Sequence, residues 1–109
     1  MDWFNSEYYH ILYRNRDIKE AETFINNIIK KLDLKTGLKV LDLACGKGRH
    51  STYLEKLGFI VTGIDKSMNN IKKARENENE NLNFLNKEMI DDLGGKYDAI
   101  FNLFTSFGY

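Results

Sequence analysis

Two acidic residues beside short apolar runs are the first candidates for chemistry in this chain of 109 residues. Asp42 lies within the run VLDL, residues 40–43, and Asp65 directly follows the run IVTGI, residues 60–64. Runs of this kind are typical of strands that are buried on both faces of a parallel sheet. A carboxylate at the end of such a strand, as Asp65 would be, can accept hydrogen bonds from both hydroxyls of a ribose. We therefore expect an adenosine-like group at this edge of the sheet.

The loop ACGKGRH, residues 44–50, follows the first acid and carries two glycines. Gly46 and Gly48 allow the backbone to approach a ligand closely or to adopt positive φ. The helix expected next presents free N–H groups at its start, and Asp42 can anchor a positive group or order a water beside it. A ligand with an ammonium and a carboxylate at one end suits this arrangement. The sequence thus favours a nucleoside with an amino-acid tail over a pyrophosphate.

The dinucleotide fingerprint G-x-G-x-x-G does not fit this loop in either register. If the pattern starts at Gly46, its third glycine falls on Ser51, and if it starts at Ala44, the third falls on Arg49. The phosphate-binding pattern G-x-x-x-x-G-K-[ST] is absent as well. Half of a nicotinamide-dependent dehydrogenase is therefore disfavoured.

The elements that must position these residues alternate between helix and strand periodicity. Apolar residues recur at helical spacing from Ile18 to Leu32, so the segment through Leu32 is predicted to be helical. After it we expect strands at 39–43, 59–64, 82–85 and 97–104, helices at 50–57 and from a Ser67 cap to Ala74, a solvated polar turn at 76–81, and a turn or short helix at 88–93. This order predicts an α/β fold with a Rossmann-like doubly wound sheet, mostly parallel and incomplete, made of an N-terminal helix plus about four strands.

Four stretches of the chain resemble the class I S-adenosylmethionine-dependent methyltransferases: VLDLACGKGRH, VTGIDKS, NFLNKEM and YDAIFNLFTSFGY. The resemblance runs from about Gly37 to the end of the chain. It implies a single domain, with an N-terminal helical segment at 1–36 and, at 37–109, the cofactor-binding half of a methyltransferase whose C-terminal part is absent. It also implies S-adenosylmethionine as cofactor, S-adenosylhomocysteine as product, and methyl transfer to a small-molecule acceptor.

The same resemblance assigns thirteen residues to the cofactor, in groups that follow the chain. The methionine end would be cradled by Asp42, Ala44, Cys45, Gly46 and Gly48; Asp65 would bind the ribose; Lys66, Glu88 and Met89 would flank the adenine; Asn102 and Leu103 would face the methyl group and the substrate; and Tyr13 and Arg16, in a leader helix, would close over the cofactor's carboxylate. No residue is assigned as a catalytic base. His50 is favoured as a packing or capping residue, with a role as a base left open.

The amino-acid composition limits which partners the chain is expected to bind and in which cellular compartment it is expected to lie. Sixteen basic residues balance sixteen acidic ones, which disfavours a partner held mainly through its phosphates without excluding nucleic acid. The single cysteine, Cys45, leaves no disulfide framework and no cysteine-based metal site, so no metal is expected and a reducing cytoplasmic location is the default. No apolar stretch approaches the length that spans a membrane.

One alternative function and one expected contact follow from the incomplete sheet that the sequence predicts. The chain could be a non-catalytic fragment that binds a nucleoside or serves in assembly without turning over. The strand predicted to end near Phe104 would lack a neighbour on its outer flank, and such an open apolar edge is a template for pairing with another chain. Self-association through that edge is therefore expected. The sequence assigns no methyl acceptor.

Overall fold

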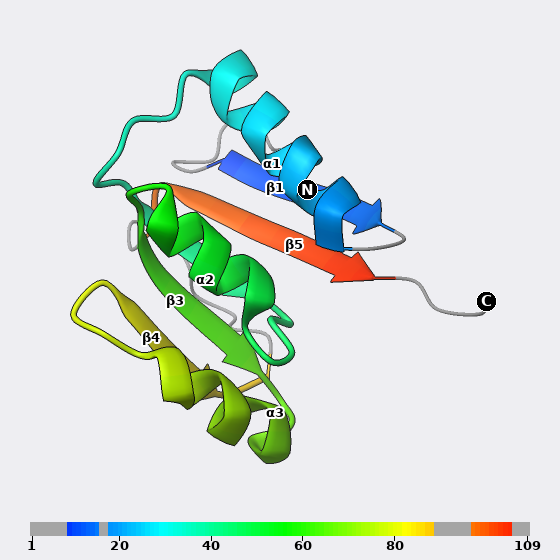
Figure 1. Cartoon of the computed structure of the whole chain (residues 1–109), viewed down its shortest axis with the longest axis vertical. Helices are drawn as coiled ribbons and strands as arrows, with labels where there is room; N and C mark the ends of the chain where they lie inside the picture. The colour runs from blue at the N-terminus through cyan, green and yellow to red at the C-terminus, as the bar shows by residue number, and fades with distance from the viewer. Residues whose placement is uncertain (1–8, 16–17, 89–96, 106–109) are drawn as a thin grey trace.

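Strands and helices alternate in the order expected from the sequence, with one further strand at the start (Figure 1). The computed structural model describes residues 9–15, 18–88 and 97–105. The elements are β1 (Tyr9–Asn15), α1 (Ile18–Leu32), β2 (Lys39–Leu43), α2 (Arg49–Lys56), β3 (Ile60–Asp65), α3 (Met68–Ala74), the 3-10 turn η2 (Arg75–Asn77), β4 (Leu82–Asn86) and β5 (Ala99–Thr105). Among the described helices, none is long and apolar enough to cross a membrane.

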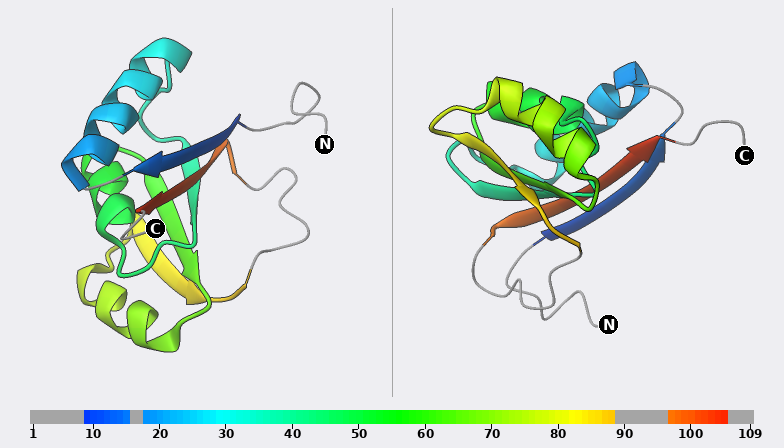
Figure 2. Two further views of the ribbon diagram at one scale, coloured as in Figure 1. Left: turned by 90° about the vertical axis from the view of Figure 1, so that its right-hand side faces the viewer. Right: turned by 90° about the horizontal axis from the view of Figure 1, so that it is seen from below.

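The five described strands form one sheet in the order β1-β5-β2-β3-β4, and every neighbouring pair is parallel. The connections through α1, α2 and α3 all step across the sheet in the same direction. Right-handed crossovers then place these three helices on one face, as Figure 2 shows. The predicted α/β class with a Rossmann-like parallel sheet is confirmed. The strand order reverses beside β2, and in open sheets of this kind ligands bind at the carboxyl edge near such a reversal.

The main core lies between the sheet and its three helices. Ala21 and Ile25 of α1 are fully buried, as the helical spacing of its apolar residues predicts. The strands contribute inward-facing residues at alternate positions, and these are Ile11, Val40, Val61, Leu82, Phe84, Ala99, Phe101 and Leu103. A smaller cluster on the opposite face contains Leu41, Leu43, Ile64 and Ile100. The strands thus bury apolar side chains on both faces, which explains their nearly continuous apolar sequence.

The helical prediction for the N-terminal segment is right for α1 and wrong for residues 9–15. Residues 9–15 form β1, which pairs with β5 over seven successive residues, from Tyr9 opposite Ala99 to Asn15 opposite Thr105. The helical periodicity begins only at Ile18, and β1 is stabilised by a partner strand some 90 residues further along the chain. Local spacing carries no signal of that pairing. Residues 9–15 therefore contribute a strand to the sheet.

The same pairing removes the reason for expecting self-association through β5. The flank of β5 that the sequence leaves uncovered is occupied by β1, and its other flank pairs with β2. The prediction of an open edge at this strand is wrong because the chain itself supplies the missing neighbour.

Side chains close the outer edge of β4. The backbone N–H of Phe84 donates to the Glu78 carboxylate at 2.8 Å, and the Phe84 carbonyl accepts from Nε and Nη2 of Arg75 at 3.4 and 3.3 Å. Asn79 and Leu82 exchange backbone hydrogen bonds in the same region. The polar turn predicted at 76–81 is exposed as expected, yet it also satisfies edge groups that would otherwise be open to a second strand.

Candidate functional site

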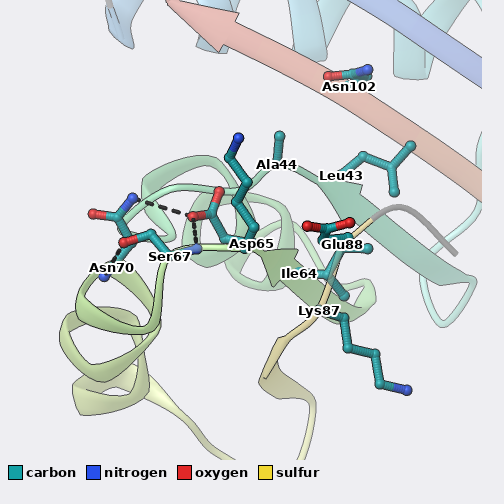
Figure 3. A pocket seen from close by; sticks show the side chains of 10 residues that line it. Leu43, Ala44, Ile64, Asp65, Ser67, Asn70, Lys87, Glu88 and Asn102 are labelled. Atoms are coloured by element: carbon teal, nitrogen blue, oxygen red, sulfur yellow. Dashed lines mark hydrogen bonds between the residues drawn. The ribbon is translucent and has the colours of Figure 1, made fainter.

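A cleft of about 620 Å³ lies at the carboxyl ends of β2, β3 and β4, next to the reversal of strand order (Figure 3). This volume is within the range usual for small-molecule sites. The cleft is lined by Leu43, Ala44, Ile64, Asp65, Lys66, Ser67, Asn70, Lys87, Glu88 and Asn102. Its apolar floor comes from the ends of β2 and β3. Its polar groups come from the strand residues Asp65 and Asn102, from the turns after β3 and β4, and from Asn70 in the first turn of α3.

The carboxylate of Asp65 is held by three donors from two neighbouring segments. Oδ1 accepts the backbone N–H of Gly46 at 3.1 Å, while Oδ2 accepts the backbone N–H of Ser67 at 3.0 Å and Nδ2 of Asn70 at 3.2 Å. Because a carboxylate has about four acceptor sites, these bonds leave roughly one, on Oδ1. Asp65 therefore ties the glycine loop to the start of α3 and still offers an acceptor to a ligand.

The turn after β3 is fixed from the side of β4. Nδ2 of Asn86 donates to the carbonyls of Asp65 and Lys66 at 3.1 and 3.0 Å, and the N–H of Lys87 donates to the Asp65 carbonyl at 3.0 Å. Ser67 caps α3, as the sequence predicts, with its hydroxyl oxygen accepting the N–H of Asn70 at 3.2 Å. Lys66 and Ser67 are consequently presented to the cleft by a turn with little freedom.

Three residues of the glycine loop adopt left-handed conformations, and they face different surroundings. Ala44, at φ +53°, lines the cleft although it is not a glycine. A Cβ added to Gly46, at φ +59°, would meet no atom within 4 Å. A Cβ added to Gly48, at φ +84°, would lie 2.6 Å from the ring of Phe84. Gly46 thus leaves open space for a ligand, whereas Gly48 is required by packing inside the protein.

Asp42 is fully buried beneath α2 and does not line the cleft. Its Oδ2 accepts the hydroxyl of the buried Ser51 at 2.6 Å, and its Oδ1 has no hydrogen-bond partner among the described residues. Burial raises the pKa of this carboxyl from 3.8 to about 7; the Ser51 bond acts in the opposite direction, and the Asp65 charge adds to the rise. Asp42 is therefore a costly buried acid next to the glycine loop.

Cys45 and His50 have the environments of inert residues. Burial, reinforced by the charges of Asp42 and Asp65, raises the pKa of the Cys45 thiol far above its usual range, so no reactive thiolate is expected. His50 is buried, and no group in the described part of the chain bonds to its Nδ1. Its burial lowers the pKa of the imidazole, an effect that Arg49 adds to and Glu22 opposes. Neither residue lines the cleft.

The structure brings together five of the thirteen residues assigned from the sequence: Ala44, Asp65, Lys66, Glu88 and Asn102. Gly46 adjoins them through its bond to Asp65. Four others lie in the interior, and these are Asp42, Cys45, Gly48 and Leu103. A Cβ at Gly48 would meet the Phe84 ring, so packing inside the protein requires this glycine, and contact of its backbone with the cofactor stays a prediction. Leu103 faces the helix-covered core. Met89 and Arg16 lie outside the described residues, as does the side chain of Tyr13, whose backbone belongs to β1 and not to a leader helix.

Five residues that line the cleft were not assigned from the sequence: Leu43, Ile64, Ser67, Asn70 and Lys87. Leu43 and Ile64 are the last apolar residues of their strands. Each directly precedes a residue assigned to the cofactor, Ala44 or Asp65, so their place in the lining could have been predicted from the sequence. The sequence predicts Ser67 only as a helix cap. Asn70 gives no local signal, since its contact with Asp65 depends on how α3 is joined to β3.

Residues 3–106 match the family described as tellurite resistance protein TehB. The chain belongs to the TehB family. A Haemophilus influenzae protein described as a probable S-adenosyl-L-methionine-dependent methyltransferase TehB is 54% identical over 46 residues, which are 41% of this chain and 16% of that protein. The glycine/sarcosine N-methyltransferase of Halorhodospira halochloris is 35% identical over 85 residues, 72% of this chain and 32% of that enzyme.

The solved structures that resemble this TehB-family chain include the magnesium protoporphyrin IX methyltransferase of Synechocystis PCC 6803 with bound SAM. The TM-score is 0.58 at 26% identity, over 73% of this chain and 42% of that one. The class I S-adenosylmethionine-dependent methyltransferase family expected from the motifs is thereby confirmed, with S-adenosylmethionine as the family's cofactor. The TehB-family chain spans a third or less of the length of the two curated relatives described above.

Proposed function

We propose that this chain is the S-adenosylmethionine-binding portion of a methyltransferase that transfers a methyl group to a small-molecule acceptor. The observation that carries the proposal is the Asp65 carboxylate. It lies at the carboxyl end of β3, is oriented by three donors, and retains an acceptor at a cleft of small-molecule size. Such a carboxylate suits a ribose hydroxyl. The open space at Gly46 allows the backbone of the loop to approach the methionine end of the cofactor.

The remaining lining residues fit the rest of the cofactor. Lys66 and Glu88 would lie beside the adenine, with the end of Ile64 beneath it, and Asn102 of β5 would face the methyl group and the acceptor. S-adenosylmethionine supplies a methyl group on a positively charged sulfur, which is already activated toward displacement. The protein then contributes chiefly proximity and alignment, which are worth roughly 7–11 kcal/mol of the barrier when geometry is ideal. A general base is needed only if the acceptor must lose a proton early.

Replacing Asp65 with alanine is expected to weaken binding of S-adenosylhomocysteine by about 1–3 kcal/mol, or roughly 5- to 150-fold in dissociation constant. The physical reason is the loss of hydrogen bonds to a charged acceptor. Isothermal titration of the wild-type and variant chains measures the effect. Glu80→Ala, which removes an exposed acid from the turn before β4, is the matched control and should bind as the wild type does. Unchanged affinity in Asp65→Ala would remove the ribose assignment.

The same titration distinguishes the proposal from the alternatives. S-adenosylmethionine and S-adenosylhomocysteine should bind, and NAD should not, because the loop lacks the glycine spacing for a pyrophosphate. A methyl-release assay on the whole protein then separates an enzyme from a non-catalytic nucleoside-binding module. Binding of NAD in preference to both sulfur nucleosides would contradict the proposed function.

A further inference from the structure

Asn70 makes two hydrogen bonds at the edge of the cleft, one to Asp65 at the end of β3 and one to Ser67 in the turn that follows. It is the third residue of α3 and lines the cleft. Its backbone N–H donates to the Ser67 hydroxyl, and its Nδ2 donates to Oδ2 of Asp65 at 3.2 Å (Figure 3). The helix cap therefore fixes the backbone of Asn70 at the point from which its amide reaches the carboxylate.

The donors around Asp65 are divided between its two oxygens. Oδ2 takes the Ser67 N–H and the Asn70 amide, and Oδ1 takes the Gly46 N–H. The Asn70 bond is the one among these three that comes from a side chain. Without it, Oδ2 would keep a single donor and the carboxylate could rotate away from the orientation that leaves Oδ1 available.

We propose that Asn70 is a positioning residue that orients the Asp65 carboxylate to accept a hydrogen bond from a nucleoside's ribose, and so makes affinity depend on the ribose hydroxyls. This inference rests on the proposed function, because it assumes that Asp65 accepts from the ribose. A neutral amide suits this role because it donates a hydrogen bond without bringing a positive charge that would form an ion pair with the carboxylate. A carboxylate at position 70 would instead repel Asp65.

The experiment compares affinities for adenosine and 2′,3′-dideoxyadenosine, measured by nuclear magnetic resonance titration of the full chain. In the wild type, adenosine should bind about tenfold more tightly or better, because dideoxyadenosine lacks both hydroxyl donors. In Asn70→Ala this preference should fall about fivefold. Asn70→Leu retains side-chain bulk without a hydrogen-bond donor, and its preference for adenosine should fall by the same factor as that of Asn70→Ala. Asn69→Ala, on the exposed side of the same helix, should leave the preference unchanged.

A double variant separates action through Asp65 from direct contact with the ligand. Adding Asn70→Ala to Asp65→Ala should cause no further loss of adenosine affinity, because the group that Asn70 orients is already gone. A strong wild-type preference that persists in both Asn70 variants, or losses that add in the double variant, would overturn the positioning role while leaving the ribose assignment intact. No preference in the wild type would overturn the ribose assignment and this inference with it.

Discussion

Gly48→Ala is expected to destabilise the chain by about 3 kcal/mol or more, enough to leave a small domain largely unfolded. The added Cβ would lie 2.6 and 2.7 Å from two ring atoms of Phe84 and 3.0 Å from Cβ of Ala74. Phe84 is 1% exposed and packed in the main core, so its ring has little room to move. Alanine must also adopt φ +84°, a left-handed conformation unfavourable for a residue with a Cβ.

Gly46→Ala is the matched control, since the same change is made two residues earlier in the same loop. A Cβ there meets nothing within 4 Å, so only the left-handed backbone at φ +59° opposes it, at a cost of roughly 1–2 kcal/mol. Urea unfolding compares the two variants. Gly46→Ala should fold and lose affinity for S-adenosylhomocysteine, whereas Gly48→Ala should unfold at a much lower urea concentration or be unfolded without urea. Equal stability of the two would mean that Phe84 does not restrict the loop.

The second large effect is a pH dependence of stability that originates at Asp42. Its pKa of about 7 in the folded chain exceeds the usual 3.8, so between these values the folded state holds a proton that the unfolded chain has lost. Protonated Asp42 therefore contributes its full stabilisation below about pH 4. This contribution falls as the pH rises from about 4 to about 7, and the free energy of unfolding does not change further through this group above about pH 7. Integrated from about pH 4 to about pH 7, the loss in the free energy of unfolding is on the order of 4 kcal/mol.

Asp42→Asn removes this titration while keeping an oxygen that can accept the Ser51 hydroxyl. Relative to the wild type, the variant should gain stability steadily from about pH 4 to about pH 7, because over that range only the wild type must take up a proton on folding, and this uptake becomes less favourable as the pH rises. Chemical denaturation at a series of pH values gives the two curves. Asp33→Asn, at an exposed acid, is the control and should run parallel to the wild type. Parallel curves for Asp42→Asn would show that the buried carboxyl does not titrate in this range.

Much of the fold was accessible from the sequence because its signals are local. The apolar runs place β2, β3 and β4 to within a residue or two, and Ser67 marks the start of α3 through its own hydroxyl. Asp65 is recognisable because an acid at the end of an apolar strand meets a glycine loop at the same edge. These features depend on a few consecutive residues, so spacing alone reveals them.

The features that sequence analysis missed depend on contacts between distant residues. β1 becomes a strand through β5, and the role of Gly48 is decided by Phe84, 36 positions away. Glu78 appears in a polar run, and only the position of β4 shows that its carboxylate closes a sheet edge. The two glycines of the loop are alike in sequence context. The neighbours supplied by the folded chain distinguish the one that faces open space from the one that faces the core.

The central claim is that the cleft at the carboxyl ends of β2, β3 and β4 binds the nucleoside of S-adenosylmethionine. A ¹H–¹⁵N correlation spectrum of the chain, titrated with S-adenosylhomocysteine, tests it most directly. A second cleft of about 320 Å³, at the amino ends of the strands and lined in part by Thr36 and Leu57, is an internal control. We expect saturable shifts at the amides of Gly46, Asp65 and Lys66, with those of Thr36 and Leu57 unchanged. No saturable shift, or shifts confined to the second cleft, would contradict the claim.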